Sequence, residues 1–369
     1  MEDPPSQVLR FCTTRDGVRL AYAIGGSGPA LVKTANWMGH LEFDARSPVW
    51  APWLAALSQH SLLLRYDARG CGLSDRDVDT FSLEAWLSDL ETVVDAANVE
   101  EPFDLFGMSQ GGPVAVAYAA RHPGRVRRLV LYGSYARGPL RRGLDRAQQE
   151  EARALLDVIR LGWGKDNPAF RQLFTSLFLP GGSAEQMAWF NELERVSTSP
   201  ETAAALVEAT YTLDVTALAP SIRAPTLVLH ARNDARVPFE EGRLLAALIP
   251  EARFVGLDSA NHVLLAQERA WGAFLEEVGG FLGRPLVAPA AGPPTAVAAL
   301  AKAELTDRER DVVALLRRGW TNKRIARELD LSPKTVRNYV STVLSKLGAA
   351  TRSEVAALAA EAGVGDEPA

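Results

Sequence analysis

Runs of consecutive apolar residues alternate with amphipathic segments through residues 7–283. Several runs, such as SLLLRY, RLVLY and TLVLH, are continuously apolar over most of their length, which is typical of strands buried on both faces of a parallel sheet. The runs predict strands at Val8–Thr13, Val18–Ile24, Ala30–Ala35, Ser61–Tyr66, Phe103–Phe106, Val126–Tyr132, Thr226–His230 and Arg253–Gly256. Helical patterns between them predict helices at Ser82–Ala97, Ser109–His122, Phe239–Leu248 and His262–Phe281. This alternation predicts an α/β fold with a mostly parallel sheet.

Residues 136–220 interrupt the alternation, because they contain several helical patterns and no convincing strand. Phe170, Phe174 and Phe178 recur every four residues and form an apolar stripe, with Trp163 and Trp189 nearby in the sequence. We expect a helical lid over the sheet. Two interpretations of the stripe stay open: it packs the lid onto the sheet, or part of it lines a pocket for an apolar ligand.

A change of composition divides the chain. Residues 284–303 are rich in Pro and Ala and poor in charge, which predicts a linker between a domain of residues 1–283 and one of residues 304–363. Residues 304–353 carry 11 Lys and Arg against 6 Asp and Glu, a net charge of +5, whereas the rest of the chain has a net charge of −10. The basic end is therefore the part expected to contact an anionic polymer.

The amino-acid composition further narrows the classes of protein to which the chain can belong. Of the 369 residues, 47% are apolar and 23% charged, as in ordinary globular proteins, and no apolar run is long enough to predict a transmembrane helix. The N-terminal sequence lacks the basic start and apolar core of a signal peptide, so we expect a cytoplasmic protein with no membrane partner. Two cysteines, and the lack of metal-binding or nucleotide-binding motifs, predict no metal and no cofactor.

The segment Gly107-Met108-Ser109-Gln110-Gly111 has the form G-x-S-x-G, between the apolar run FDLF and a helical pattern. In this context the glycines permit a sharp turn that exposes the serine hydroxyl at a helix N-terminus, where a developing oxyanion is favoured. The alternative interpretation is a tight glycine turn in which Ser109 only caps the helix.

An acid and a histidine follow later strands. Asp234 comes just after TLVLH, and His262 comes after the strand near Phe254. The order Ser, acid, His, each after a strand, is that of the α/β-hydrolases. Ser109 is then the nucleophile, His262 the general base and acid, and Asp234 the residue that orients the imidazole. Taken singly, Asp234 could cap a turn and His262 could cap a helix.

Residues 7–283 resemble the α/β-hydrolase fold family over nearly their whole length. The stretch YDARGCGLSD at residues 66–75 is similar to the family's D-x-R-G-x-G-x-S stretch, and this resemblance implies structural roles for Asp67 and Arg69. It also implies a lid between the sixth and seventh strands, where residues 136–220 lie. A serine nucleophile points to acyl transfer to water, from an ester, a lactone, an amide or a C–C β-diketone bond.

The expected oxyanion hole departs from the family pattern. Relatives carry His-Gly-x after an early strand, where this chain has Thr34-Ala35-Asn36-Trp37-Met38. By position, the backbone N–H groups of Trp37 and Gln110 are the expected donors. His40 belongs to a W-x-x-H-L-E run similar to hydrolase-like domains fused to signalling modules, and it could line the pocket or lie on the surface. The residues expected to line the ligand pocket are Trp37, Met108, Phe170, Phe174 and Trp189.

Residues 304–363 show three or four short helical patterns. Thr306 begins a capping box, and Ser332 followed by Pro333 begins a helix with an apolar stripe. The pattern indicates a helix-turn-helix, with a small bundle of solvated charges as the alternative. The segment from LTDRERD to LGAATR resembles the LuxR-type DNA-binding domain from end to end. Tyr339 stands where His is frequent in that family, and we expect it to face the core or the helix junction.

This second resemblance implies binding to double-stranded DNA as a homodimer, with the helix from Ser332 in the major groove. The residues expected to contact base edges and nearby phosphates are Lys334, Arg337, Asn338 and Ser341. The residues expected to contact phosphates and fix the register are Thr321, Lys323, Arg324 and Thr335.

Two functions follow from the two halves. In the first, the protein is a DNA-binding transcriptional regulator whose hydrolase-like domain senses a small apolar ester- or lactone-like molecule; in one version it also hydrolyses that signal. In the alternative, it is a serine hydrolase with an accessory DNA-binding tail. An intact Ser-Asp-His set does not decide between sensing and catalysis.

Overall fold

The computed structural model describes residues 7–36, 38–163, 168–287, 303, 305–347, 349 and 351–361. The chain divides into two compact units, one of residues 3–289 and one formed mainly by residues 290–369, and each is described by itself. In the described residues, no helix is both long enough and apolar enough to cross a membrane.

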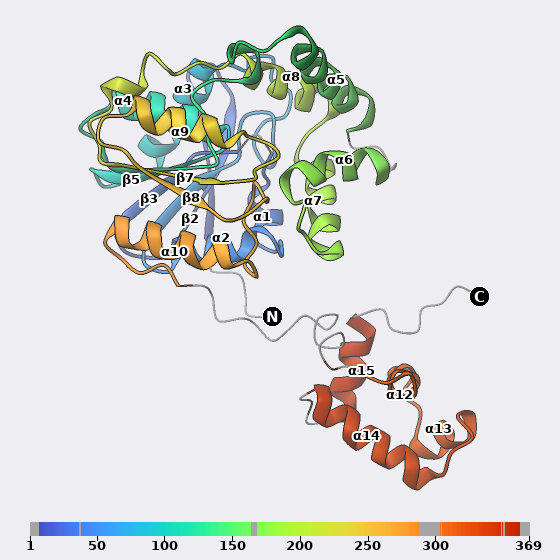
Figure 1. Cartoon of the computed structure of the whole chain (residues 1–369). Helices are drawn as coiled ribbons and strands as arrows, with labels where there is room; N and C mark the ends of the chain where they lie inside the picture. The colour runs from blue at the N-terminus through green and yellow to red at the C-terminus, as the bar shows by residue number, and fades with distance from the viewer. Residues whose placement is uncertain are drawn as a thin grey trace. The chain divides into compact units, whose positions relative to one another are not determined.

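The larger unit is built on an eight-stranded sheet with the order β1-β2-β4-β3-β5-β6-β7-β8 (Figure 1). Strand β2 pairs antiparallel with β1 and β4, and every other pair is parallel. All residues of β5 and β7 are buried, as expected for continuous apolar strands. The predicted α/β fold with a mostly parallel sheet is confirmed. The strands are β1 (Gln7–Thr13), β2 (Arg19–Gly25), β3 (Ala30–Lys33), β4 (Leu62–Tyr66), β5 (Phe103–Met108), β6 (Val126–Tyr132), β7 (Thr226–Ala231) and β8 (Arg253–Leu257).

Helices cover both faces of the sheet. Figure 1 shows α3 (Leu83–Ala97), α4 (Gly111–Arg121) and α9 (Phe239–Leu248) over one face, and α2 (Trp50–Ser58) and α10 (Arg269–Leu282) over the other. A short helix, α1 (Leu41–Asp44), precedes α2. On the second face the rings of Trp53 and Phe274 lie 4.7 Å apart. These contacts join α2 and α10 to one aromatic core.

Two details differ from the sequence prediction. The last helix begins at Arg269, not His262, because residues 262–268 form a loop in which the Glu268 carboxylate accepts hydrogen bonds from the Leu265 N–H and the Ser259 hydroxyl. Helix α2 was not predicted, because six of its nine residues are buried and its sequence shows no polar face.

The lid lies between β6 and β7, and its described α-helices are α5 (Arg146–Gly162), α6 (Pro168–Phe178), α7 (Ala184–Ser197) and α8 (Pro200–Tyr211) (Figure 1). The aromatic side chains of the predicted stripe pack inside it. The ring of Phe174 lies 5.5 Å from that of Trp163 and 5.0 Å from that of Phe178. Phe178 in turn contacts Phe190 of α7 at 5.4 Å. This part of the stripe therefore forms the core of the lid.

The chain that leaves α10 is bound to the sheet. Arg284 is nearly buried, and its guanidinium donates to the Asp104 carboxylate at 2.7 Å and to the Ser61 hydroxyl at 2.8 Å. Asp104 is the second residue of β5 and also accepts from Arg127. Residue 284 is thus held at the amino-terminal end of the strand that precedes Ser109.

The smaller unit contains α12 (Asp307–Arg317), α13 (Asn322–Glu328), α14 (Pro333–Leu347) and α15 (Arg352–Glu361). Its core includes Val312, Ile325, Val336 and Val343. Both hydrogen bonds of the predicted capping box at Thr306 are formed. Tyr339 packs against this core, in agreement with the expectation from the sequence.

Candidate active site and nucleic-acid interface

Ser109 occupies a sharp turn between β5 and α4. Its φ is +49°, in the left-handed region that residues with a Cβ rarely adopt. The flanking glycines are required sterically: a Cβ on Gly107 would lie 2.8 Å from the Ala115 Cβ, and one on Gly111 would lie 2.3 Å from the Thr34 hydroxyl oxygen. The Ser109 N–H donates to the Tyr132 carbonyl of β6 at 3.0 Å. These contacts hold the serine at the carboxyl end of β5.

Asp234 and His262 form a buried hydrogen-bonded pair. Asp234 Oδ2 lies 2.7 Å from His262 Nδ1, and both side chains are almost fully buried. The other oxygen, Oδ1, accepts from the backbone N–H groups of Arg236 and Val237 at 2.8 and 2.9 Å. Burial raises the pKa of Asp234, but the charge and hydrogen bond of His262 outweigh it and leave the pKa below its usual value. The carboxylate is therefore charged and oriented toward the imidazole.

His262 lies at the carboxyl end of β6, the strand that pairs with β5. Gly133 follows Tyr132, and a Cβ on Gly133 would lie 3.2 Å from the His262 ring. The structure has no hydrogen bond between the Ser109 hydroxyl and His262, whose Nε2 is buried without a partner among the described residues. Hydrogen bonds at such sites often tighten only when a substrate binds.

A second histidine lies beside the same carboxylate. His230 is the penultimate residue of β7 and is fully buried, with its Nε2 3.6 Å from Asp234 Oδ2 and 2.9 Å from the Val237 carbonyl. Burial lowers the pKa of His230, so the neutral ring donates to that carbonyl. Its position at the end of a predicted strand gave no sign of the proximity to Asp234.

Of the two expected oxyanion donors, one is described. Gln110 is buried beside Ser109, and its N–H makes no hydrogen bond to the residues that the structure describes. Trp37 lies outside the described residues. The preceding loop is held by Lys33, whose ammonium donates to the Asn36 amide oxygen at 3.1 Å. His40 caps α1 by accepting from the Phe43 N–H at 3.3 Å, so its side chain has a structural partner.

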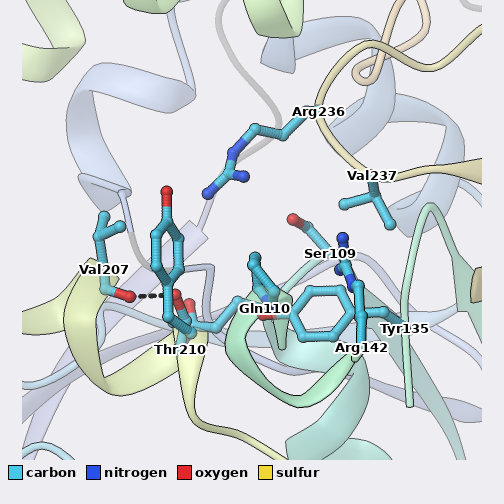
Figure 2. Close-up of a pocket in the computed structure, with 10 residues that line it drawn as sticks. Ser109, Gln110, Tyr135, Arg142, Val207, Thr210, Arg236 and Val237 are labelled. Atoms are coloured by element: carbon cyan, nitrogen blue, oxygen red, sulfur yellow. Dashed lines mark hydrogen bonds between the residues drawn. The ribbon is translucent and has the colours of Figure 1, made fainter. Parts of the chain in front are cut away.

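A small pocket, partly open to solvent, lies in front of Ser109 (Figure 2). Seven of its ten lining residues have polar side chains. None of the four expected pocket residues that the structure describes lines it. Met108 is buried at the end of β5, Phe174 is buried in the lid, Phe170 packs near Gly162 of α5, and the ring of Trp189 lies 4.6 Å from that of Phe43. The lining residues are instead Ser109, Gln110, Tyr135, Pro139, Arg142, Val207, Thr210, Tyr211, Arg236 and Val237.

Sequence reasoning missed Tyr135, Arg142, Tyr211 and Arg236 as lining residues. Arg236 had a signal, because it stands two residues after Asp234 in the same loop. Arg142 and Tyr211 come from the two ends of the lid segment, and only the fold brings them together. Among the described residues, no group of three or more His, Cys, Asp or Glu could hold a metal ion.

Asp67 and Arg69 make buried contacts away from this cavity. Arg69 binds Asp89 with two hydrogen bonds and also contacts Asp16. Asp67 Oδ2 accepts from the N–H groups of Leu41 and Leu73 at 3.2 and 2.9 Å. These contacts tie the turn after β4 to its neighbours, as the resemblance implied.

In the smaller unit, the residues expected to contact bases share one face of α14. Lys334, Arg337, Asn338 and Ser341 are all exposed and spaced at helical intervals. Thr321 caps α13 through the Arg324 N–H, and the Ser332 and Thr335 hydroxyls are hydrogen-bonded at 2.7 Å. Lys323 and Arg324 are exposed, with the Arg324 guanidinium 3.9 Å from the centre of the Trp320 ring. A basic, polar surface therefore surrounds the start of α14.

The fold and these two sites define the class of the protein. Residues 43–268 match the α/β hydrolase fold family, and residues 303–359 match the luxR family of bacterial regulatory proteins. The chain therefore belongs to the α/β-hydrolase fold family and carries a C-terminal LuxR-type DNA-binding domain.

Individual relatives are hydrolases that match the larger unit. The chain is 32% identical to a putative carbamate hydrolase, RutD, of Azorhizobium caulinodans, over 67% of this chain and 89% of the relative. It is 30% identical to a 2-hydroxymuconate semialdehyde hydrolase of Pseudomonas, over 70% of this chain and 85% of the relative. The crystal structure of an enol-lactonase from Burkholderia xenovorans superposes with a TM-score of 0.60 at 26% identity and covers 74% of this chain and 100% of that protein. These relatives support hydrolase activity in the larger unit.

Proposed function

We propose that the protein is a DNA-binding transcriptional regulator whose α/β-hydrolase domain senses and hydrolyses a small ester- or lactone-like molecule. The observation that carries the proposal is the buried Asp234–His262 pair at the end of β6 together with the strained turn of Ser109 at the end of the neighbouring strand β5, in a chain that also has a DNA-binding domain. A carboxylate held by two backbone N–H groups and an imidazole is arranged to stabilise a proton on His262.

In this mechanism the Ser109 oxygen attacks the substrate carbonyl while its proton passes to His262 Nε2. Asp234 stabilises the imidazolium that forms. The Gln110 N–H, near the N-terminus of α4, donates to the developing oxyanion, and the Trp37 N–H is the second donor by its sequence position. The imidazolium protonates the leaving group, and water activated by His262 then releases the acyl group from Ser109.

The DNA-binding half of the proposal assigns α14 to the major groove. Lys334, Arg337, Asn338 and Ser341 then face base edges, while Thr321, Lys323, Arg324 and Thr335 face phosphates. We further propose that the protein acts as a homodimer that binds two half-sites. The exposure of Lys334, Arg337, Asn338 and Ser341 on one face of α14 supports the assignment.

Hydrolysis of p-nitrophenyl butyrate by the full chain tests the catalytic half. We expect Ser109→Ala to lower kcat by about three powers of ten or more, because the nucleophile is lost, and to leave the affinity for DNA unchanged. Ser221→Ala is the matched control, because Ser221 is exposed and its hydroxyl only donates to the Leu218 carbonyl. Equal turnover by the Ser109→Ala variant and the parent chain would contradict the assignment.

A further inference from the structure

Two arginine side chains extend toward the space in front of the Ser109 hydroxyl (Figure 2). Arg236 comes from the loop that carries Asp234, and Arg142 follows the short helix after β6. Tyr135, Thr210 and Tyr211 line the same cavity. Burial raises the pKa of Tyr135 to about 12, so its hydroxyl remains a hydrogen-bond donor at neutral pH. A wall with two guanidinium groups and two phenols is unusual for a pocket that takes a purely apolar molecule.

Neither guanidinium is fully neutralised by the described residues. Arg236 has no ion pair there, and its guanidinium lies 5.8 Å from the centre of the Phe178 ring. The Arg142 Nε donates to the Arg137 carbonyl at 3.0 Å and lies 3.7 Å from the Glu241 carboxylate. Glu241 has a closer partner in Arg137, at 2.8 Å. One charge beside the cavity is therefore loosely paired and the other unpaired.

A guanidinium group beside a partly closed cavity is stabilised by a nearby negative charge, because removing an unpaired charge from water costs free energy. Glu241 is shared by Arg137 and Arg142 and offsets only part of their charge, which leaves positive charge beside the cavity for an anionic ligand to balance. The planar guanidinium binds a carboxylate with two parallel hydrogen bonds. The Val207, Val237 and Pro139 side chains supply the apolar part of the wall.

We propose that the cavity selects a monoanionic substrate, an ester or lactone that also carries a carboxylate, and that Arg236 and Arg142 bind this carboxylate. The inference rests on the proposed hydrolase function and names its substrate class. It replaces the purely apolar ligand expected from the aromatic stripe of the lid, since that stripe packs within the lid instead.

A matched pair of esters tests this selectivity. The mono-p-nitrophenyl ester of succinic acid and p-nitrophenyl butyrate share a four-carbon acyl group and a leaving group, and differ by one carboxylate. We expect the full chain to have a kcat/KM about tenfold or more higher for the succinate ester, mainly through a lower KM, because a charge-assisted hydrogen bond is formed. Arg236→Gln should lower the ratio of the two kcat/KM values about tenfold, and Arg236→Lys should lower it less.

Arg232→Gln is the control for net charge. Arg232 lies in the same loop, is exposed, and its guanidinium lies over the Phe239 ring, so the ratio should not change. A ratio near one in the parent chain, or a ratio unaffected by Arg236→Gln, would overturn the proposal. If neither ester is hydrolysed, the hydrolase function fails, and calorimetric titration with monomethyl succinate decides the anion site separately. Binding of monomethyl succinate that is lost in the Arg236→Gln variant supports the site, and no binding to the parent chain refutes it.

Discussion

Ser109 combines a strained backbone with a buried setting. The left-handed conformation costs a residue with a Cβ about 1–2 kcal/mol, and it persists because neighbouring contacts hold it. The Tyr132 carbonyl accepts its N–H, and Gly107 and Gly111 allow the close packing of β5, α4 and the loop after β3. The same conformation turns the hydroxyl toward the cavity. The strained backbone of Ser109 is therefore a physical reason to propose this residue as the nucleophile.

A second group of residues concentrates charge in the interior without taking part in the proposed chemistry. Lys33, Asp44, Arg65 and Asp67 lie close together around the turn after β4. Burial lowers the pKa of Lys33 to about 8 and raises the pKa of Asp44 to about 6 and that of Asp67 to about 7. Because Lys33 also binds Asn36 before Trp37, this cluster supports the loop that carries an expected oxyanion donor.

The raised pKa of Asp67 predicts how the stability of the fold depends on pH. Its pKa is higher in the folded chain than the ordinary 3.8, so the folded state binds a proton that the unfolded state releases. Its stabilising contribution is complete below about pH 3.8 and is lost as the pH rises through about 7. We expect Asp67→Asn to remove this loss, on the order of 3 kcal/mol between pH 4 and 8. Urea unfolding followed by tryptophan fluorescence measures it.

The neutral amide can keep both hydrogen bonds that Asp67 Oδ2 accepts, so the substitution should change the pH dependence more than the fold. Asp79→Asn is the control, because Asp79 is exposed. If the Asp67→Asn variant loses stability between pH 4 and 8 as steeply as the parent chain, the buried cluster does not hold the proton.

Among the elements, α6 of the lid is bound directly to the loop of His262. The Phe178 carbonyl at the end of α6 accepts from the His262 N–H at 2.9 Å, and the two rings lie 5.4 Å apart, edge to face. The Asn261 side chain accepts from the Gly181 N–H at 2.8 Å. A displacement of the lid therefore shifts the backbone of His262. Lid position and the geometry of the Asp234–His262 pair are not independent.

Helix α14 gives a prediction for DNA recognition. Arg337 lies in the middle of its exposed polar face, whereas Lys323 lies on α13. On duplexes selected by the parent chain from a random library, we expect Arg337→Ala to reduce discrimination against scrambled DNA by about 1–3 kcal/mol. Lys323→Ala should weaken binding to both DNAs equally and reduce the salt slope by about one. Fluorescence anisotropy at several salt concentrations measures both effects.

Arg308→Ala provides a control of equal charge change, because Arg308 is exposed on α12 and pairs with Asp311. It should leave discrimination unchanged. Loss of discrimination in Lys323→Ala but not in Arg337→Ala would mean that α14 is not the helix that reads the bases.

At the scale of the whole molecule, the sequence predicted best those elements whose structure depends on residues within one short segment. All the predicted strands are present, because continuous apolar runs bounded by turns have few alternatives. Helix α2 was missed because burial removed its polar face. The Asp234–His262 pair could be predicted from the order of residues along strands. The cavity wall could not, because Arg142, Tyr211 and Arg236 become neighbours only through the connections of the fold.

Coupling between the two halves distinguishes a regulator from an enzyme with a DNA-binding tail. The Ser109→Ala chain, which should bind without turnover, can be titrated with monomethyl succinate in the presence and absence of the selected duplex. For a regulator we expect the duplex to change the affinity for the ester about fivefold or more, and the ester to change the affinity for the duplex by the same factor. Equal ester affinities in the two titrations would favour the enzyme with an accessory tail.

The contact between Arg284 and Asp104 fixes the place where the chain leaves the sheet of the larger unit. Asp104 lies near the first residue of β5 and Ser109 follows its last, so about five residues, roughly 16 Å of extended chain, separate them. The segment that follows Arg284 therefore starts at one end of the strand whose other end is followed by Ser109, the proposed nucleophile. The proposed nucleophile and the residue at which the chain leaves the larger unit therefore lie at opposite ends of one buried strand, β5.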